Sequence, residues 1–558
     1  MAFEKASPSR ASVESEDYHF GSLSKLEEQS LLIQANEPRY EFTPPPSPTL
    51  PPAQPTAFLD GVRGIAAFLV FLHHFAPNFY FEEHHHGFGQ KDPNTNETWH
   101  HFASLPFIRI FYTGGDAAVA LFFVLSGYVL TVVPLTKIIH MTREGGGTRE
   151  GWRTVVKSIL SAVIRRPIRL YLPAFLVSIT YAALRHTVFG PLTAFPELQP
   201  SVGAEISSCA HEFVKFFNPF QRHGINRVWF SYGVVVWTIP IELKGSMLVF
   251  LLTALYAFAS QSRFYRKLYF LQLIALSILL LLLNQWTMSL FVAGMVLALC
   301  DILGLHFTSL SIPLPLINRR RHSSSSSKVW IHFTRLLNHI YLIAGFYLLT
   351  QPSHKSSVNY SLYTPGWHFL TKLIPKTYLT ESGVVNWFDP EYFRFWTSIG
   401  GVLTLYALLR ITWCQRAFAT RVPMYLGKIS FALYLTHVTV LIVTEPFVLR
   451  ITGQWFDGSP MGERWYDDKV YLPEWGYMGL NVRYFGCMAM QLSVCLMVAH
   501  MVTILFDWPA LRLAHKVAQI LRLSNGIKSK PARSDVFIAA PAKREDLYEE
   551  KTRGRRLA

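Results

Sequence analysis

Long apolar segments alternate with polar connections along most of the chain. Ten of these segments approach or exceed the ~20 residues that an α-helix needs to cross the hydrocarbon core of a bilayer. Their approximate bounds are 58–80, 107–134, 169–189, 229–258, 268–284, 287–304, 333–350, 394–413, 425–449 and 480–506. The pattern therefore predicts an all-α integral membrane protein with about ten transmembrane helices.

The two ends of the chain have a different composition. Residues 1–57 are rich in Ser, Glu and Pro and contain no apolar core of the length that a signal peptide needs. We expect a disordered cytosolic tail there, with an SH3-type partner for its Pro-x-x-Pro segments as the alternative. The expected domains are this tail, a transmembrane domain over 58–510 and a basic, disordered cytosolic tail over 511–558.

Composition and charge support a membrane protein. Half of the 558 residues are hydrophobic and only 16% are charged, against about 25% in soluble domains. The net charge of +16 comes largely from basic residues between apolar segments, so it indicates topology and not nucleic-acid binding. One alternating set of connections, with the C-terminal tail, holds 32 Lys and Arg residues and the other set holds 9. The positive-inside rule then places both termini in the cytosol.

Other short patterns refine the compartment. The sequons beginning at Asn96 and Asn359 fall in connections predicted to be outside the cytosol, which fits the endoplasmic reticulum, Golgi or plasma membrane. The five cysteines show no C-x-x-C spacing, and His84-His85-His86 has no metal-site spacing with carboxylates. We expect neither a disulfide framework nor a bound metal.

The first apolar segment carries ionisable side chains. Arg63 and His74 are eleven residues apart, which is three helical turns plus ~20° and about 16 Å along the axis. Both therefore lie on one face of the helix. Charged groups within a membrane span are costly, so they indicate function unless they snorkel or bond to a neighbouring backbone.

This segment, with its context LDGVRGIAA, resembles the acyltransferase-3 family of polytopic membrane acyltransferases, most closely the fungal members. The resemblance extends in order over about 58–510. It implies His74 as the general base, against a structural histidine, and Arg63 as a ligand for the phosphates of an acyl-CoA, against an interfacial anchor. The ~16 Å between them is of the order of an extended pantetheine arm. His73 faces another direction and is expected to be structural.

Arg166 and Arg169 match the Arg-x-x-Arg motif of the family and share one helical face. They are predicted to bind donor phosphates, with positive-inside anchoring as the alternative. Pro167 between them suits a first helical turn.

Asp116 lies in GGDAAVALFFVLSGY, which resembles the second-span signature of the family. It is a candidate to orient the His74 imidazole, against a carboxylate at a helix end. Trp237 and Glu242 lie in WTIPIE, which resembles a further signature. Glu242 is counted with the catalytic candidates as a polar-cavity residue that pairs with an arginine or histidine, and Trp237 with the substrate-binding residues.

His437 ends LGKISFALYLTH, which resembles the ninth-span signature, and is either acceptor-binding or structural. Asp507-Trp508-Pro509 resembles the end of the last span and is expected to close the fold.

The resemblance implies transfer of an acyl group, most often acetyl, from acyl-CoA to a hydroxyl of a carbohydrate, lipid or secondary metabolite. The expected partners are acetyl-CoA or another acyl-CoA, the hydroxyl-bearing acceptor and membrane lipids, without a permanently bound cofactor. A multispan transporter or lipid flippase would explain the same buried charges without acyl chemistry. A receptor or scaffold that uses the Pro-rich tail is a third alternative.

Overall fold

The computed structural model describes residues 56–91, 96–143, 149–187, 196–218, 230–305, 324–353, 360–379, 391–454 and 460–523. Within these ranges the secondary structure is helical, apart from one isolated bridge between Lys91 and Thr98. The N-terminal tail before residue 56, the C-terminal tail after residue 523 and the sequon residue Asn359 lie outside the described residues.

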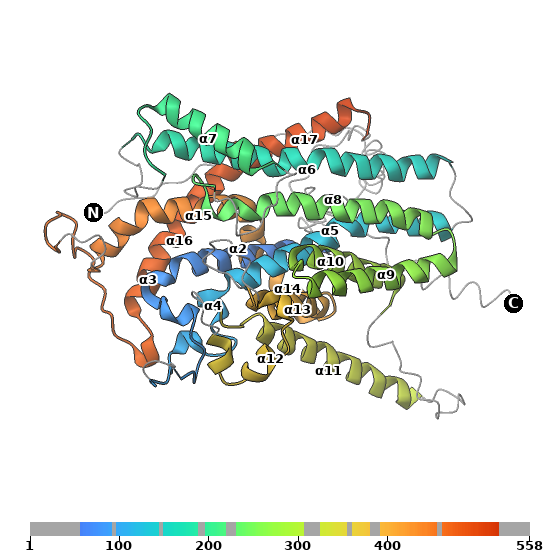
Figure 1. Ribbon diagram of the computed structural model, residues 1–558, viewed down its shortest axis with the longest axis horizontal. Coiled ribbons are helices and arrows are strands. Elements are labelled where there is room, and N and C mark those ends of the chain that lie inside the picture. Colours follow the sequence, from blue (N-terminus) through green and yellow to red (C-terminus); the bar gives the residue numbers. More distant parts are fainter. Residues whose placement is uncertain are drawn as a thin grey trace, which may run out of the picture. The chain divides into compact units, whose positions relative to one another are not determined.

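Eight helical segments of the described chain are long and apolar enough to cross a membrane, or nine if one bent pair counts as a single span. Figure 1 shows most of them running roughly alongside one another. The eight are α2 (Phe58–Phe75), α5 (Gly115–Arg143), α6 (Arg149–Leu184), α8 (Thr238–Ala259), α9 (Arg263–Leu282), α10 (Trp286–Leu303), α15 (Arg421–Ile451) and the segment Tyr477–Ile520 that contains α16 (Val482–Val502). The bent pair is α13 (Phe393–Leu408) with α14 (Thr412–Phe418), which meet at 98°.

The predicted segment 333–350 corresponds to α11 (Ser324–Leu348), a helix that is not among the eight. Polar residues such as His332, Arg335 and Asn338 interrupt its apolar sequence. Eight of the ten predicted membrane-spanning helices therefore have a counterpart among the described residues, or nine if the bent pair α13–α14 is counted.

Several helices differ from their predicted bounds, and α2 and α6 are two of them. α2 ends at Phe75, and Pro77 begins the short helix α3 (Pro77–Tyr80). α6 begins at Arg149, so Pro167 lies inside it and not in its first turn. α6 packs against α17 (Trp508–Ile520), and Nη1 of Arg165 lies 3.4 Å from Nδ1 of His515.

The last segment also continues past its predicted end. A π-helical turn, Thr503–Asp507, joins α16 to α17. Pro509 lies in the first turn of α17, where its missing amide hydrogen is not needed, so it does not end the helical segment.

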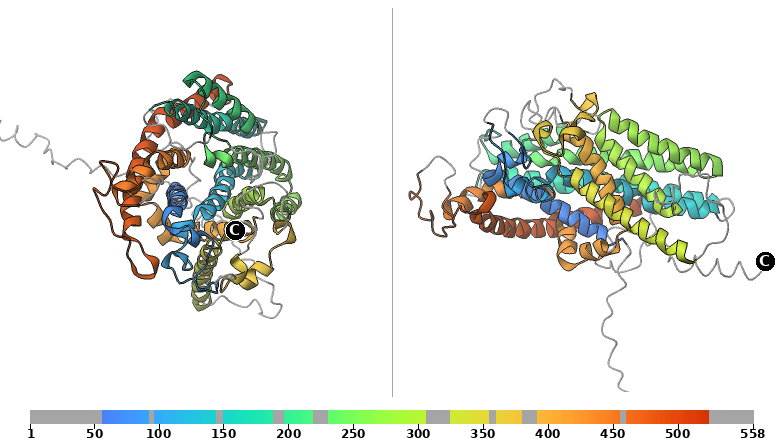
Figure 2. Two further views of the ribbon diagram at one scale, coloured as in Figure 1. Left: turned by 60° about the vertical axis from the view of Figure 1, so that its left-hand side comes forward. Right: turned by 90° about the horizontal axis from the view of Figure 1, so that it is seen from below.

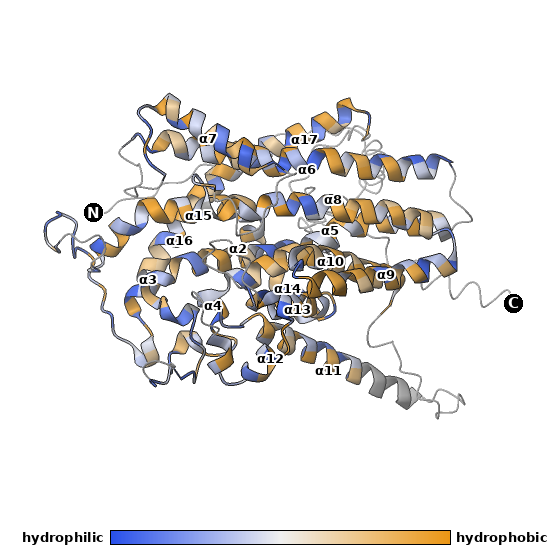
Figure 3. Ribbon diagram, in the orientation of Figure 1, coloured by the Kyte–Doolittle hydropathy of each residue, from blue (hydrophilic) through white to orange (hydrophobic). Residues whose placement is uncertain are grey.

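Burial distinguishes central from peripheral helices. In the most apolar stretch of each helix, 67% of the residues are buried in α2 and in α15, whereas only 6% are buried in α9. In Figure 2 (left), α2 in blue lies inside the other helices, whereas Figure 3 shows that most residues along α9 are apolar. Leu271 and Ile278 of α9 are among its exposed apolar side chains, as expected of a helix that faces lipid.

Glycines bring α2 and α15 into close contact. A Cβ atom on Gly64 would lie 2.3 Å from the backbone nitrogen of Gly427, and one on Gly427 would lie 2.1 Å from the carbonyl oxygen of Asp60. Such small residues let membrane helices approach at backbone distance. Gly127 of α5 and Gly294 of α10 make a second close crossing of this kind. The α2–α15 crossing holds the ionisable side chains of α2 beside α15.

Candidate active site

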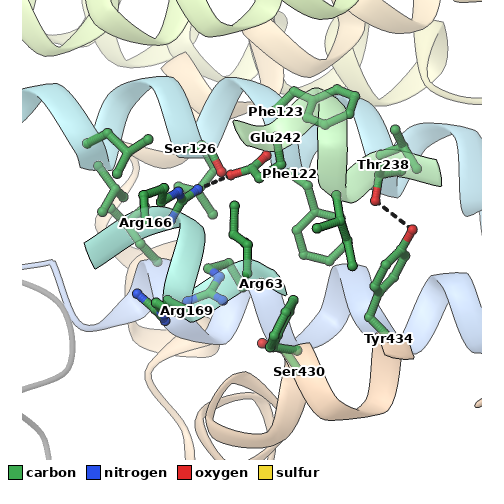
Figure 4. A pocket seen from close by; sticks show the side chains of 18 of the residues that line it. Arg63, Phe122, Phe123, Ser126, Arg166, Arg169, Thr238, Glu242, Ser430 and Tyr434 are labelled. Carbon is green, nitrogen blue, oxygen red and sulfur yellow. Dashed lines mark hydrogen bonds and ion pairs between the residues drawn. The ribbon is translucent and has the colours of Figure 1, made fainter. Parts of the chain in front are cut away.

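A pocket between five helices collects the three predicted phosphate-binding arginines. Arg63 comes from α2, and Arg166 and Arg169 from adjacent turns of α6. Figure 4 shows them toward one end of the pocket, with Glu242 of α8 beside Arg166. The full lining is Leu59, Asp60, Arg63, Val119, Phe122, Phe123, Leu125, Ser126, Val129, Leu130, Arg166, Arg169, Leu170, Thr238, Ile239, Glu242, Ser430, Phe431 and Tyr434.

Arg166 is held by α8. Its Nη2 donates to Oε1 of Glu242, and its Nε donates to Oγ of Ser246 at 3.0 Å. The side chains of Arg166 and Glu242 are 10% and 15% exposed, so the ion pair is largely shielded from solvent. The structure therefore places Glu242 against an arginine of the pocket, as one of the sequence alternatives expected.

Arg63 and Arg169 complete the basic end of the pocket. Nη1 of Arg63 lies 3.4 Å from Oδ1 of Asp60, one turn earlier on α2. Asp507 is close enough to Arg169 for an electrostatic interaction between the last span and α6. The pocket itself presents three guanidinium groups and two carboxylates, Asp60 and Glu242, so its formal charge is positive.

Two histidines meet at the opposite end of α2. The ring centroids of His74 and His437 lie 5.2 Å apart, so the structure brings together residues from α2 and α15 that are remote in sequence. Nδ1 of His437 lies 3.0 Å from the carbonyl oxygen of Leu433. A carbonyl can only accept, so Nδ1 carries a hydrogen and Nε2 of a neutral His437 is an acceptor. Among the described residues this buried Nε2 has no hydrogen-bond partner.

Asp116 lies against Arg394 and not against His74. Nη1 of Arg394, from the first turn of α13, is 2.7 Å from Oδ1 of Asp116. The imidazole nearest this pair is His73, whose ring packs so closely on Gly115 that a Cβ there would lie 2.5 Å from it. The Asp116–Arg394 pair is not predicted from the sequence, and a role of Asp116 in orienting His74 stays a prediction.

Arg394 also accounts for the position of Trp237. Its guanidinium carbon lies 6.0 Å from the Trp237 ring centroid and 4.7 Å from that of Trp286. Cation–π contacts of this kind stabilise a buried guanidinium. Trp237 is not a lining residue of the pocket, whereas its neighbour Thr238 is.

Sequence reasoning missed three residues of this region. Arg394 stands at the start of an apolar segment, which is the signal that identified Arg63. Thr238 and Tyr434 both lie inside signatures that the sequence analysis quoted, and their hydroxyl oxygens are 2.6 Å apart. In the part of the chain that the structure describes, no group of three or more His, Cys, Asp and Glu residues is arranged to hold a metal ion.

Comparisons with known proteins agree with this architecture. The model of the acyltransferase-3 family, described as an acyltransferase domain, matches residues 56–500. The chain is 27% identical to the O-acetyltransferase PaAT-1 of Phomopsis amygdali over 409 residues, which is 69% of this chain and 72% of that protein. It is 24% identical to the acyltransferase R4 of a Phoma species, covering 71% of this chain and 84% of the relative. It is 23% identical to the acyltransferase clz18 of Cochliobolus lunatus, covering 71% and 85%.

No solved structure matches the chain. The family match covers the five helices that form the pocket and both histidines. The chain therefore belongs to the acyltransferase-3 family and is a multi-pass membrane enzyme that transfers acyl groups.

Proposed function

We propose that this enzyme transfers an acyl group from acyl-CoA to a hydroxyl of a carbohydrate, lipid or secondary metabolite. The observation that carries the proposal is the position of Arg63 and His74 on one helix, with a basic pocket at the first and a histidine pair at the second. One relative is named an O-acetyltransferase, which favours acetyl as the group transferred. Membership of an acyltransferase family removes the reason to prefer a transporter or a scaffold.

The basic pocket is the proposed donor site. Guanidinium groups suit phosphate because they remain charged and donate hydrogen bonds in a planar fork. Arg63, Arg166 and Arg169 would bind CoA phosphates, and Glu242 would keep the Arg166 fork oriented through their ion pair. The pantetheine arm would then extend toward the histidine pair.

The histidine pair is the proposed catalytic centre. His74 accepts the proton of the acceptor hydroxyl, whose oxygen attacks the thioester carbonyl carbon. The carbon–sulfur bond breaks, CoA leaves as the thiolate, and the proton from His74 neutralises that thiolate. A transient acyl group on His74 is the alternative route.

His437 is proposed to bind the acceptor. Its Nε2, which has no hydrogen-bond partner among the described residues, would accept from a second hydroxyl or amide of the acceptor molecule, so that the hydrogen of the reacting hydroxyl stays with His74. Asp116 and Trp237 would act indirectly, because both contact Arg394, and Arg394 is close enough to His73 for an electrostatic interaction. They are proposed to position this end of the site.

We also propose ten spans over residues 58–510, with both termini in the cytosol. The excess of Lys and Arg in one set of connections supports this orientation. In this orientation the arginines lie toward the cytosol and the histidines toward the opposite face.

Arg63→Gln is expected to weaken CoA binding by about tenfold or more, because one charge-assisted hydrogen bond to phosphate is lost. Binding of pantetheine, which has no phosphate, should change little. Titration of the purified protein with both ligands measures this. Arg335→Gln, an exposed arginine on α11, is the control. Equal CoA affinity in Arg63→Gln and wild type would contradict the donor site.

His74→Ala is expected to reduce extract-dependent release of CoA from acetyl-CoA by at least about 100-fold, because the general base is removed. The assay uses purified protein with pooled lipid and glycan extracts as acceptors, and mass spectrometry identifies the acylated product. His140→Ala, an exposed histidine of α5, is the matched control and should keep full activity. Undiminished release by His74→Ala would exclude His74 as the base.

The topology is expected to appear in thiol labelling of sealed microsomes from the endoplasmic reticulum. All five native cysteines are buried, so single introduced cysteines can be read against a low background. Lys137→Cys should react with an impermeant maleimide in intact vesicles, and Asn96→Cys only after permeabilisation. Both positions are exposed. The reverse pattern would mean that the termini lie on the lumenal side.

A further inference from the structure

The donor pocket ends before it reaches the histidine pair. Along α5 it is lined from Leu130 to Val119, which is about 16 Å of helix. On α15 its lining residues are Ser430, Phe431 and Tyr434, whereas His437 lies one turn further on and is not a lining residue. Figure 4 shows Arg166 and Arg169 toward one end and Tyr434 with Thr238 toward the other.

Tyr434 is held in place at this end by three contacts. Its hydroxyl donates to the carbonyl oxygen of Val235. The hydroxyl of Thr238, 2.6 Å away, therefore donates to the Tyr434 oxygen. The ring of Phe122 packs against that of Tyr434 edge to face, with centroids 6.4 Å apart. The phenol is only 8% exposed, so these contacts keep a rigid side chain across the end of the pocket.

The histidines follow directly behind this side chain. The ring centroids of Tyr434 and His437 are 6.2 Å apart, and those of His437 and His74 are 5.2 Å apart. Tyr434 therefore stands between the space for the donor and the groups that receive the acceptor. The length of the pocket matches an extended pantetheine arm, so a donor anchored at the arginines brings its sulfur to Tyr434. Only the acyl group remains to be accommodated beyond that point.

We propose that Tyr434, fixed by Thr238 and Val235, sets the length of the acyl chain and restricts the donor to short acyl groups of the acetyl class. This inference rests on the proposed acyl-CoA site and adds the residue that selects among acyl-CoAs. A longer chain would have to displace a packed aromatic ring with two hydrogen-bonding neighbours. An acetyl group needs only the space beside it.

The test is the affinity of purified protein for CoA, acetyl-CoA, butyryl-CoA and octanoyl-CoA. Wild type should bind octanoyl-CoA at least about tenfold more weakly than acetyl-CoA, because the additional methylene groups of the octanoyl chain would clash with the Tyr434 side chain. Tyr434→Ala should remove most of that difference and keep the affinity for CoA itself. Tyr434→Phe keeps the ring but loses the hydrogen bonds to Val235 and Thr238, so it should keep only part of the wild-type preference.

A matched control distinguishes a specific steric limit at Tyr434 from a general loss of packing around the pocket. Phe431→Ala removes an aromatic ring one turn nearer the arginines, so it should change all chain lengths alike. If Tyr434→Ala does not bind CoA, Tyr434→Leu provides the smaller reduction in volume. The inference is overturned if Tyr434→Ala or Tyr434→Leu binds CoA and discriminates chain length as wild type does, or if wild type binds octanoyl-CoA as tightly as acetyl-CoA. Absence of CoA binding by wild type would instead reject the donor site, and the inference with it.

Discussion

Charged side chains on apolar helices must be compensated, and this constraint organises the whole bundle. An uncompensated charge in the hydrocarbon region is expensive, and removing one partner of a buried pair costs about 3–5 kcal/mol. Two arginines of this bundle meet an acid from another helix. Arg166 joins α6 to α8 through Glu242, and Arg394 joins α13 to α5 through Asp116.

A third pair shows that such contacts also have a purely structural use. Nη2 of Arg410, just after α13, lies 2.9 Å from Oδ1 of Asp301 on α10. Tyr128 of α5 donates to the other carboxylate oxygen at 2.9 Å. This triad lies outside the lining of the pocket and connects three helices. The Arg166–Glu242 pair connects helices in the same way, and its guanidinium also lines the pocket.

Helix α2 carries site residues at both of its ends and is held rigidly against α15. Its glycines bring it to backbone distance from α15, so the rotation and depth of both helices are fixed. Arg63 and His74 then project from one rigid element, and His437 arrives from the other. A separation set by helical rise is less variable than one set by loops, which suits an enzyme whose co-substrate carries its phosphates far from its thioester.

The sequence predicted what periodicity and spacing encode. It located most of the apolar helices, the arginines of the pocket and the two histidines, because these depend on residue type and on position within one helix. It could not predict contacts between helices that are distant in the chain. Asp116 was assigned to His74 because nothing local identifies Arg394 as its partner.

The position of Tyr434 was hidden for the same reason. In sequence it is one more aromatic residue of an apolar helix, and only the approach of Thr238 and Val235 from another element makes it the end of a pocket. The contact between α6 and α17 likewise joins segments that are more than 300 residues apart along the chain.

The most direct measurement is a structure of the purified protein with CoA bound, determined by cryo-electron microscopy. The account predicts phosphate density beside Arg63 and Arg169, and the sulfur at the end of the pocket where Tyr434 meets Thr238. CoA bound in the reverse direction, with its nucleotide toward His74, or bound outside this pocket, would contradict the account.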